Sequence, residues 1–196
     1  MTDDSKVIAA ILDFVVETEK LKAVQRKTRP VGLDRYENSA EHSWHVCLTA
    51  LMLRDFANED IDIDKVIRML LIHDLGEIDA GDQIVYAEQD AARFNQEREG
   101  VKRVLGKLPG NRAEEYLALW DEFEAGETAE SRYARAMDRV PPLLHNLHGD
   151  GHSWKENQVP KEKVLSLNSR IAQGSSSLWA VIKDRLEKAV EQGLLK

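Results

Sequence analysis

The fold is decided by one stretch of the sequence, Ile67-Arg68-Met69-Leu70-Leu71-Ile72-His73-Asp74-Leu75-Gly76-Glu77. Apolar residues occupy nearly all sides of the helix that this stretch predicts, which is typical of a helix at the centre of a bundle. The doublet His73-Asp74 places two ionisable side chains in that buried setting. A carboxylate buried without a partner is strongly unfavourable, so such groups pair with another charge or bind a metal.

The helical period extends over most of the chain. Apolar residues repeat every three to four positions and predict helices over about 5–21, 39–57, 65–78, 88–105 and 112–123, a long helix after Thr128, and two closing helices within 160–193. No stretch has the clean alternation of a strand. The predicted fold class is therefore all-α, with residues 1–196 forming a single-domain helical bundle.

Capping and breaking residues divide these helices. Asn38, with Glu41 three positions later, indicates a capping box at the start of the second helix, and Asp64 is interpreted as the cap of the third. Pro141-Pro142 lies inside the long helix and removes two backbone donors. We therefore expect a kink beside Asp138.

The overall composition restricts the class of protein. The 196 residues are 42% hydrophobic and 32% charged, which is typical of a soluble globular domain. The net charge of −8 argues against binding to nucleic acid. Cys47 is the only cysteine, which excludes an intramolecular disulfide and a thiolate metal cluster. We recognise neither a signal peptide nor a membrane span, and expect a cytoplasmic protein without a membrane partner.

Two further helices supply residues that match the doublet chemically. His42 lies in the first turn of the second helix, and Asp138 lies in the long helix. Together with His73 and Asp74 they give two imidazoles and two carboxylates, a set that suits Mn, Fe, Co, Ni or Zn better than Ca. His45 is one turn after His42 and can reach the same ion, but we interpret it as a packing residue or a support for the ligands.

Structural explanations without a metal exist for these residues. A buried His–Asp pair can simply fix helix packing. Asp138 can pair with Arg135 or Arg139 on a helix surface. We do not predict a second metal site from the remaining histidines, because their spacing crosses a helix end and offers no matching carboxylate: His145, His148 and His152.

Acidic residues after the doublet are candidates for catalysis. Glu77 is four positions from His73 and three from Asp74, so on a helix it would overhang the same patch and could deprotonate a metal-bound water. Asp82 follows a glycine in a predicted turn. It could accept a hydrogen bond from a substrate hydroxyl or stabilise the turn itself.

A local basic segment stands out in this acidic chain. It contains Arg26, Lys27, Arg29 and Arg35. One interpretation is a solvated loop. The other is a phosphate clamp, since an arginine can bind two phosphate oxygens at once.

Three segments in this order resemble the HD-domain phosphohydrolase superfamily and, within it, the 5′-deoxynucleotidase branch. They are Glu37–Ser43, His73–Asp82 and Met137–Arg139. The resemblance covers roughly residues 21–147, the predicted metal-site core, on which the helices of residues 160–193 would pack.

The resemblance implies roles for single residues. It assigns one divalent ion (Mn, Co, Fe, Ni, Zn or Mg) to His42, His73, Asp74 and Asp138. It also implies that Glu77 activates the attacking water, that Asp74 belongs to the catalytic group, that Arg26 lies near the phosphate and that Asp82 holds the sugar 3′-hydroxyl. In one respect this chain departs from the branch, because Lys27 stands where an aromatic residue helps to exclude a ribose 2′-hydroxyl.

The function predicted from the sequence is a metal-dependent phosphomonoesterase that converts (deoxy)nucleoside 5′-monophosphates to nucleoside and phosphate. Family members are typically dimers or larger, so we expect a homo-oligomer. A phosphodiesterase or a nucleoside triphosphohydrolase is the nearest alternative. A non-catalytic nucleotide sensor that keeps the metal is an alternative from a different class.

Overall fold

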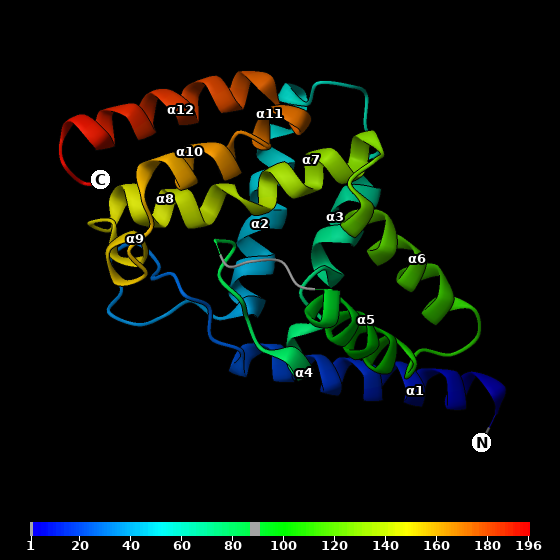
Figure 1. Cartoon of the computed structure of the whole chain (residues 1–196). Coiled ribbons are helices and arrows are strands. Elements are labelled where there is room, and N and C mark those ends of the chain that lie inside the picture. Colours follow the sequence, from blue (N-terminus) through cyan, green and yellow to red (C-terminus); the bar gives the residue numbers. More distant parts are fainter. Residues whose placement is uncertain (1, 87–90) are drawn as a thin grey trace.

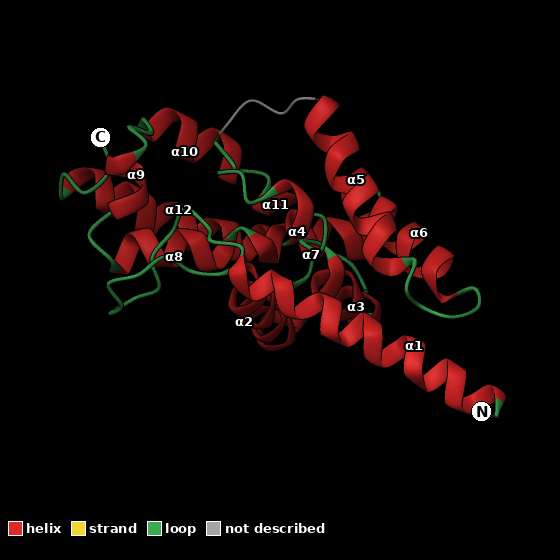
Figure 2. Cartoon of the chain, turned by 90° about the horizontal axis from the view of Figure 1, so that it is seen from below, coloured by secondary structure: helices red, strands yellow, loops and turns green. Residues whose placement is uncertain are grey.

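The computed structural model describes residues 2–86 and 91–196, and in these ranges the chain is helical (Figures 1 and 2). The only β-type pairing in them is an isolated bridge between Gln25 and Asn38. The all-α prediction is confirmed. The helices are α1 (Asp3–Thr18), η1 (Glu19–Ala23), α2 (Ser39–Leu53), η2 (Arg54–Phe56), α3 (Ile63–Ile72), α4 (Glu77–Ala80), α5 (Ala91–Leu105), α6 (Arg112–Ala125), α7 (Ala129–Asp138), α8 (Val140–His148), α9 (His152–Glu156), α10 (Lys161–Asn168), α11 (Ile171–Gly174) and α12 (Ser176–Glu191).

Helices α2, α3 and α7 contact one another and form the centre of the bundle. In Figure 1, α1 runs along the bottom and α12 along the top, with α2 and α3 between them. Val46, Met69 and Met137 from the three central helices are fully buried in one apolar cluster. Burial of such side chains is the main force that holds the helices together.

The start of α2 follows the sequence closely. The Asn38 side chain accepts a hydrogen bond from the Glu41 backbone N–H, and the Glu41 carboxylate accepts from the Asn38 N–H at 2.7 Å. This is the predicted capping box. It fixes the first turn of α2, in which His42 lies.

The third helix begins and ends earlier than predicted. Its cap is Asp62 rather than Asp64, because the Asp62 carboxylate accepts from the Lys65 backbone N–H at 3.1 Å. The helix stops at Ile72, and the chain turns before α4 instead of continuing to residue 78. A tertiary contact accompanies the turn: a Cβ atom on Gly76 would lie 2.5 Å from the Glu97 carbonyl oxygen of α5.

The predicted kink near Asp138 is confirmed as a complete break. Helix α7 ends at Asp138, and α8 begins at Val140 with Pro141 and Pro142 in its first turn. Proline is well placed there, because the first backbone N–H groups of a helix have no internal partner. The break leaves Asp138 at the end of one helix, facing the centre of the bundle.

Other boundaries differ by part of a turn or more. The first and second helices end in 3-10 turns, η1 and η2, and a short helix, α9, lies in the loop expected over residues 148–158. The helix expected from Glu88 is described from Ala91, and Glu88 itself lies outside the described residues. No helix in the described ranges is long and apolar enough to cross a membrane.

Candidate metal and catalytic site

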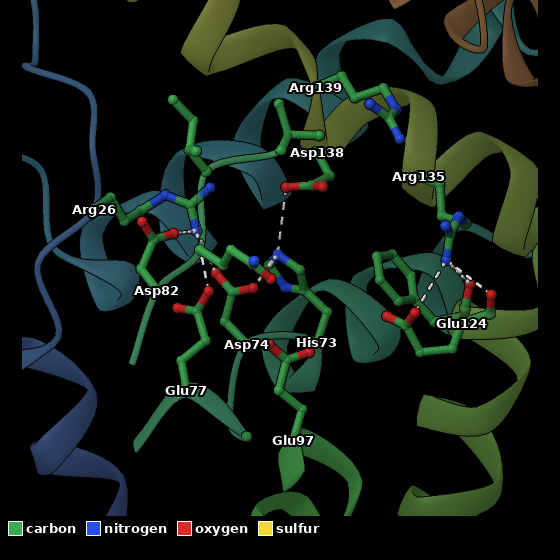
Figure 3. Close-up of a pocket in the computed structure, with 15 residues that line it drawn as sticks. Arg26, His73, Asp74, Glu77, Asp82, Glu97, Glu124, Arg135, Asp138 and Arg139 are labelled. Carbon is green, nitrogen blue, oxygen red and sulfur yellow. Dashed lines mark hydrogen bonds and ion pairs between the residues drawn. The ribbon is translucent and has the colours of Figure 1, made fainter. Parts of the chain in front are cut away.

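The predicted metal ligands converge on one region of the bundle, and Figure 3 shows three of them, His73, Asp74 and Asp138. His42 Nε2 of α2 lies 2.8 Å from Asp138 Oδ1 at the end of α7. His73 Nε2, directly after α3, lies 3.4 Å from the same oxygen and 3.1 Å from Asp74 Oδ1. Donor atoms of His42, His73 and Asp138 all lie within 4.8 Å of one another, and Asp74 adjoins them.

Hydrogen bonds orient both imidazoles toward this point. His73 Nδ1 donates to the Leu70 carbonyl oxygen at 2.7 Å, because a carbonyl can only accept. That tautomer leaves a lone pair on His73 Nε2, which is buried and has no hydrogen-bond partner. His42 Nδ1 faces Glu37 Oε2 at 3.4 Å, the usual arrangement of a carboxylate behind a metal-binding histidine. The donor set and the unpartnered buried nitrogen fit a divalent ion.

The electrostatics of this group are strongly perturbed. Burial alone would raise the pKa of Asp138, but the His42 and His73 imidazoles beside it hold that pKa well below its usual range. Burial alone would lower the pKa of His73, but Asp74 and Asp138 raise it to about 9. The negative charge of Asp74 and Asp138 beside the two imidazoles thus attracts cations, either protons or a metal ion.

Glu77 lies beside the ligand group but not on the helix that was predicted to carry it. It begins α4, and its backbone N–H donates to the Asp74 carbonyl oxygen at 3.0 Å across the turn. The Ser39 hydroxyl donates to Glu77 Oε2 at 2.5 Å. Burial, together with the neighbouring Asp74, raises the pKa of Glu77 well above its usual value. A carboxylate with a raised pKa is a better proton acceptor at neutral pH.

Arg26 joins the same cluster from the loop before α2. Its Nη1 donates to Asp74 Oδ2 at 2.9 Å and lies 3.8 Å from Glu77 Oε1 and 3.6 Å from Asp82 Oδ1. These carboxylates outweigh burial and raise the pKa of Arg26. Asp82 has a buried Oδ2 without a hydrogen-bond partner, and burial raises its pKa. Arg26, Glu77 and Asp82 therefore surround one space.

The other members of the basic segment lie apart from this cluster. Arg29 pairs with Asp34 at 3.1 Å, and Arg35 pairs with Glu41 at 2.5 Å. Lys27 is exposed and borders a small cavity beside the site. The loop interpretation fits Arg29 and Arg35, whereas Arg26 alone reaches the carboxylates around the doublet.

The space between these residues is a cavity of about 190 Å³. Its walls include residues that the sequence analysis did not assign to the site: Gln83, Glu97, Phe123, Glu124, Arg135 and Arg139. Glu97 lies in a helix of charged residues, and nothing in its spacing marks it. Glu97 reaches the wall because α5 packs against the turn that follows the doublet.

A second group of possible donors lies behind His42. Glu37, His45 and His145 have donor atoms within 4.8 Å of one another. His145 Nε2 faces Glu37 Oε1 at 3.8 Å, and the rings of His45 and His145 lie 6.0 Å apart. No carboxylate lies near His145 in the sequence at a helical spacing, but the fold brings the carboxylate of Glu37 close to it.

Comparison with known proteins agrees with this geometry. The family model for the HD domain matches residues 18–179 of this chain. The chain belongs to the HD domain family. The chain is similar to the crystal structure of a predicted metal-dependent phosphohydrolase from Magnetospirillum magnetotacticum. The two have a TM-score of 0.91 and 44% sequence identity, and the match covers 97% of this chain and 98% of that one.

Curated relatives of this HD domain are more distant in sequence. The 5′-deoxynucleotidase HDDC2 of Homo sapiens is 25% identical over 138 residues, which is 69% of this chain and 66% of the relative. The 5′-deoxynucleotidase YGK1 of Saccharomyces cerevisiae is 25% identical over 132 residues, 64% of this chain and 60% of the relative. The chain thus spans about two thirds of the length of the curated relatives. Together the comparisons support a metal-dependent phosphohydrolase.

Proposed function

We propose that this protein is a phosphomonoesterase that hydrolyses (deoxy)nucleoside 5′-monophosphates to nucleoside and phosphate. The observation that carries the proposal is the convergence of His42, His73 and Asp138 on one point, with an unpartnered imidazole nitrogen, directly beside the carboxylate of Glu77. The names of the curated relatives support the same reaction.

In this proposal His42, His73, Asp74 and Asp138 hold one divalent ion. The ion would be Mn, Co, Fe, Ni, Zn or Mg, and its chemistry is to lower the pKa of water and polarise a phosphate oxygen. Asp74 also accepts from Arg26, so it links the ion to the phosphate-binding side of the site. Asp74 is on this account both a ligand and a member of the catalytic group.

Glu77 is the proposed general base. It takes a proton from the attacking water while the water oxygen forms a bond to phosphorus and the bond to the 5′-oxygen breaks. The proton that Glu77 has taken then passes to the 5′-oxygen, directly or through a water, which gives the nucleoside hydroxyl and restores the carboxylate. The Ser39 hydroxyl holds one carboxylate oxygen, which leaves the other turned toward Arg26 and the cavity. The raised pKa of Glu77 suits this role.

Substrate recognition is assigned to Arg26 and Asp82. Arg26 would balance charge on the phosphate as the ester oxygen leaves. Asp82, with its unpartnered Oδ2, would accept from the sugar 3′-hydroxyl. Because Lys27 replaces an aromatic wall, we expect preference for deoxyribose to be weaker than in the branch it resembles.

The remaining proposals concern the whole protein. We propose a single domain over residues 1–196, with the core over 21–147 and the helices of residues 160–193 packed on it. We also propose a cytoplasmic homodimer or larger homo-oligomer that acts on a small nucleotide and on neither nucleic acid nor membrane.

The experiment that tests the reaction is a screen of nucleotides with several divalent metals, scored by phosphate release. We expect release from nucleoside 5′-monophosphates only when a metal is present. Activity confined to diesters or triphosphates would favour another phosphohydrolase. Tight nucleotide binding without release would favour a sensor.

A further inference from the structure

Arg139 has no partner among the described residues and lies in the wall of the proposed active site. It lies in the break between α7 and α8 and borders both the 190 Å³ cavity and a smaller adjoining cavity of about 50 Å³. Its Nη1 is buried and has no hydrogen-bond partner. Within residues 2–86 and 91–196 no carboxylate lies within ion-pair distance of it, and Figure 3 draws no contact from its guanidinium.

The other two arginines of the cavity are already paired. Arg26 contacts several carboxylates of the ligand cluster, as described above. Arg135 Nη1 donates to the carbonyl oxygens of Phe123 and Glu124 at 3.0 and 2.9 Å and lies 3.4 Å from a Glu124 carboxylate oxygen. Among the described residues, Arg139 is therefore the cavity arginine that no carboxylate or carbonyl oxygen pairs with, and its charge can meet a ligand.

Keeping an unpaired guanidinium in this place is unfavourable for the protein alone. Arg139 is half-buried, and its Nη1 atom is fully buried. A buried cation without a partner lowers the stability of the folded state. A ligand that brings negative charge and several acceptor oxygens would remove that penalty.

The backbone holds Arg139 close to the reaction centre. Asp138, a proposed metal ligand, directly precedes Arg139. The backbone N–H of Arg139 donates to the Met137 carbonyl oxygen. The prolines two and three positions later restrict the chain further. The start of the side chain is thus fixed beside the point where phosphate and metal would meet.

We propose that Arg139, which enters the cavity wall from the end of α7, binds the phosphate group of the substrate. This inference rests on the proposed function. The planar fork of an arginine matches two oxygens of a phosphate, and neither a sugar hydroxyl nor a neutral base offers comparable charge. The carboxylates around Arg26 neutralise much of its positive charge. Arg139 then supplies additional positive charge to the phosphate group.

The test uses inorganic phosphate as the probe, so that it does not depend on turnover. Phosphate affinity of the purified, metal-containing protein is measured by calorimetric titration for wild type, Arg139→Met, Arg139→Lys and the control Arg185→Met. Arg185 is an exposed arginine of α12 without a described ion pair. We expect Arg139→Met to weaken phosphate binding about tenfold or more, Arg139→Lys to weaken it less, and the control to match wild type.

A thermal unfolding measurement separates binding from a structural role. Without phosphate, Arg139→Met should unfold at the same temperature as wild type or higher, because it removes an unpaired buried cation. At one phosphate concentration, phosphate should raise the midpoint of wild type more than that of Arg139→Met.

Two results would overturn the assignment to phosphate. The first is wild-type phosphate affinity in both Arg139 variants. The second concerns inhibition of the hydrolysis of nucleoside 5′-monophosphates. If the Arg139 variants are inhibited less by nucleoside than wild type is, but equally by phosphate, Arg139 contacts the sugar or the base. If instead phosphate binding responds as expected but monophosphates are not hydrolysed, the proposed reaction fails while the anion site stands.

Discussion

At the scale of single residues, Glu77 separates catalysis from metal binding. Glu77→Gln keeps the side-chain volume and removes the proton acceptor. We expect kcat to fall by about two orders of magnitude or more. Metal content should change little, because Glu77 is not among the proposed ligands. Near-normal turnover in a fully metal-loaded variant would show that another group activates the water.

Arg26 and Asp82 should affect different parts of the substrate. Arg26→Ala should lower kcat/KM for all 5′-monophosphates by a similar factor, since it acts on phosphate. Asp82→Ala should instead lower kcat/KM for dAMP, which carries the 3′-hydroxyl, and change kcat/KM for the 2′,3′-dideoxy analogue little. The measurement is kcat/KM for both sugars in each variant. Equal loss for both sugars in Asp82→Ala would remove Asp82 from recognition of the 3′-hydroxyl.

The sequence predicted the chemistry of single residues better than their surroundings. His73-Asp74 and His42 could be identified because ionisable groups in apolar helices need a partner. That Arg139 and the Oδ2 atom of Asp82 lack partners among the described residues could not be predicted, because whether a charge is paired depends on contacts between distant segments. Glu37 was missed as the partner of His42 and His145 for the same reason.

At the scale of helices, an ion-pair cluster joins the N-terminal helix to α5. Glu17 of α1 accepts from Lys20 at 2.9 Å and from Arg103 of α5 at 2.7 Å. These bonds lower the pKa of Glu17 to about 2. A depressed carboxyl pKa contributes stability above the unfolded value of 4.5, and this contribution is lost as pH falls from 4.5 toward 2.

The variant Glu17→Gln tests this contribution. At pH 7 wild type should have the larger free energy of unfolding, and the difference should shrink as pH falls below 4.5. Denaturant unfolding of both proteins at several pH values measures it. A difference that does not depend on pH would mean that the contacts of Glu17 are not electrostatic in origin.

The capping box of α2 gives a second prediction at this scale. Asn38→Ala removes the acceptor for the Glu41 N–H and should lower the free energy of unfolding by about 0.5–2 kcal/mol. Because His42 lies in the same turn, metal affinity should fall as well. Denaturant unfolding and metal titration of the variant measure the two effects. Unchanged values in both would mean that packing alone fixes this turn.

Helix periods could be predicted from sequence, but helix ends that depend on tertiary contacts could not. The apolar pattern continues past Ile72 through Leu75 to Ile78, so it predicted a longer third helix. The close approach of Gly76 to Glu97 accompanies the turn that ends it. The break at Asp138 was predictable because proline acts locally.

At the scale of the whole molecule, α2, α3 and α7 serve as a frame for the site. Each of these helices places one proposed metal ligand at or beside one of its ends: His42, His73 and Asp138. The apolar core between the helices fixes the positions of these ends relative to one another. Apolar packing thus determines the distances between polar groups that lie 31 to 96 positions apart in the chain. The central claim is that these groups hold one catalytic ion.

The most direct test is anomalous X-ray scattering from crystals grown with Mn²⁺ or Zn²⁺. We predict one peak with His42 Nε2, His73 Nε2 and an oxygen each of Asp74 and Asp138 at about 2.0–2.3 Å. A control crystal of Asp138→Asn should have a weaker peak. A peak at Glu37, His45 and His145 with none at the doublet, or no peak at all in an active crystal, would contradict the account.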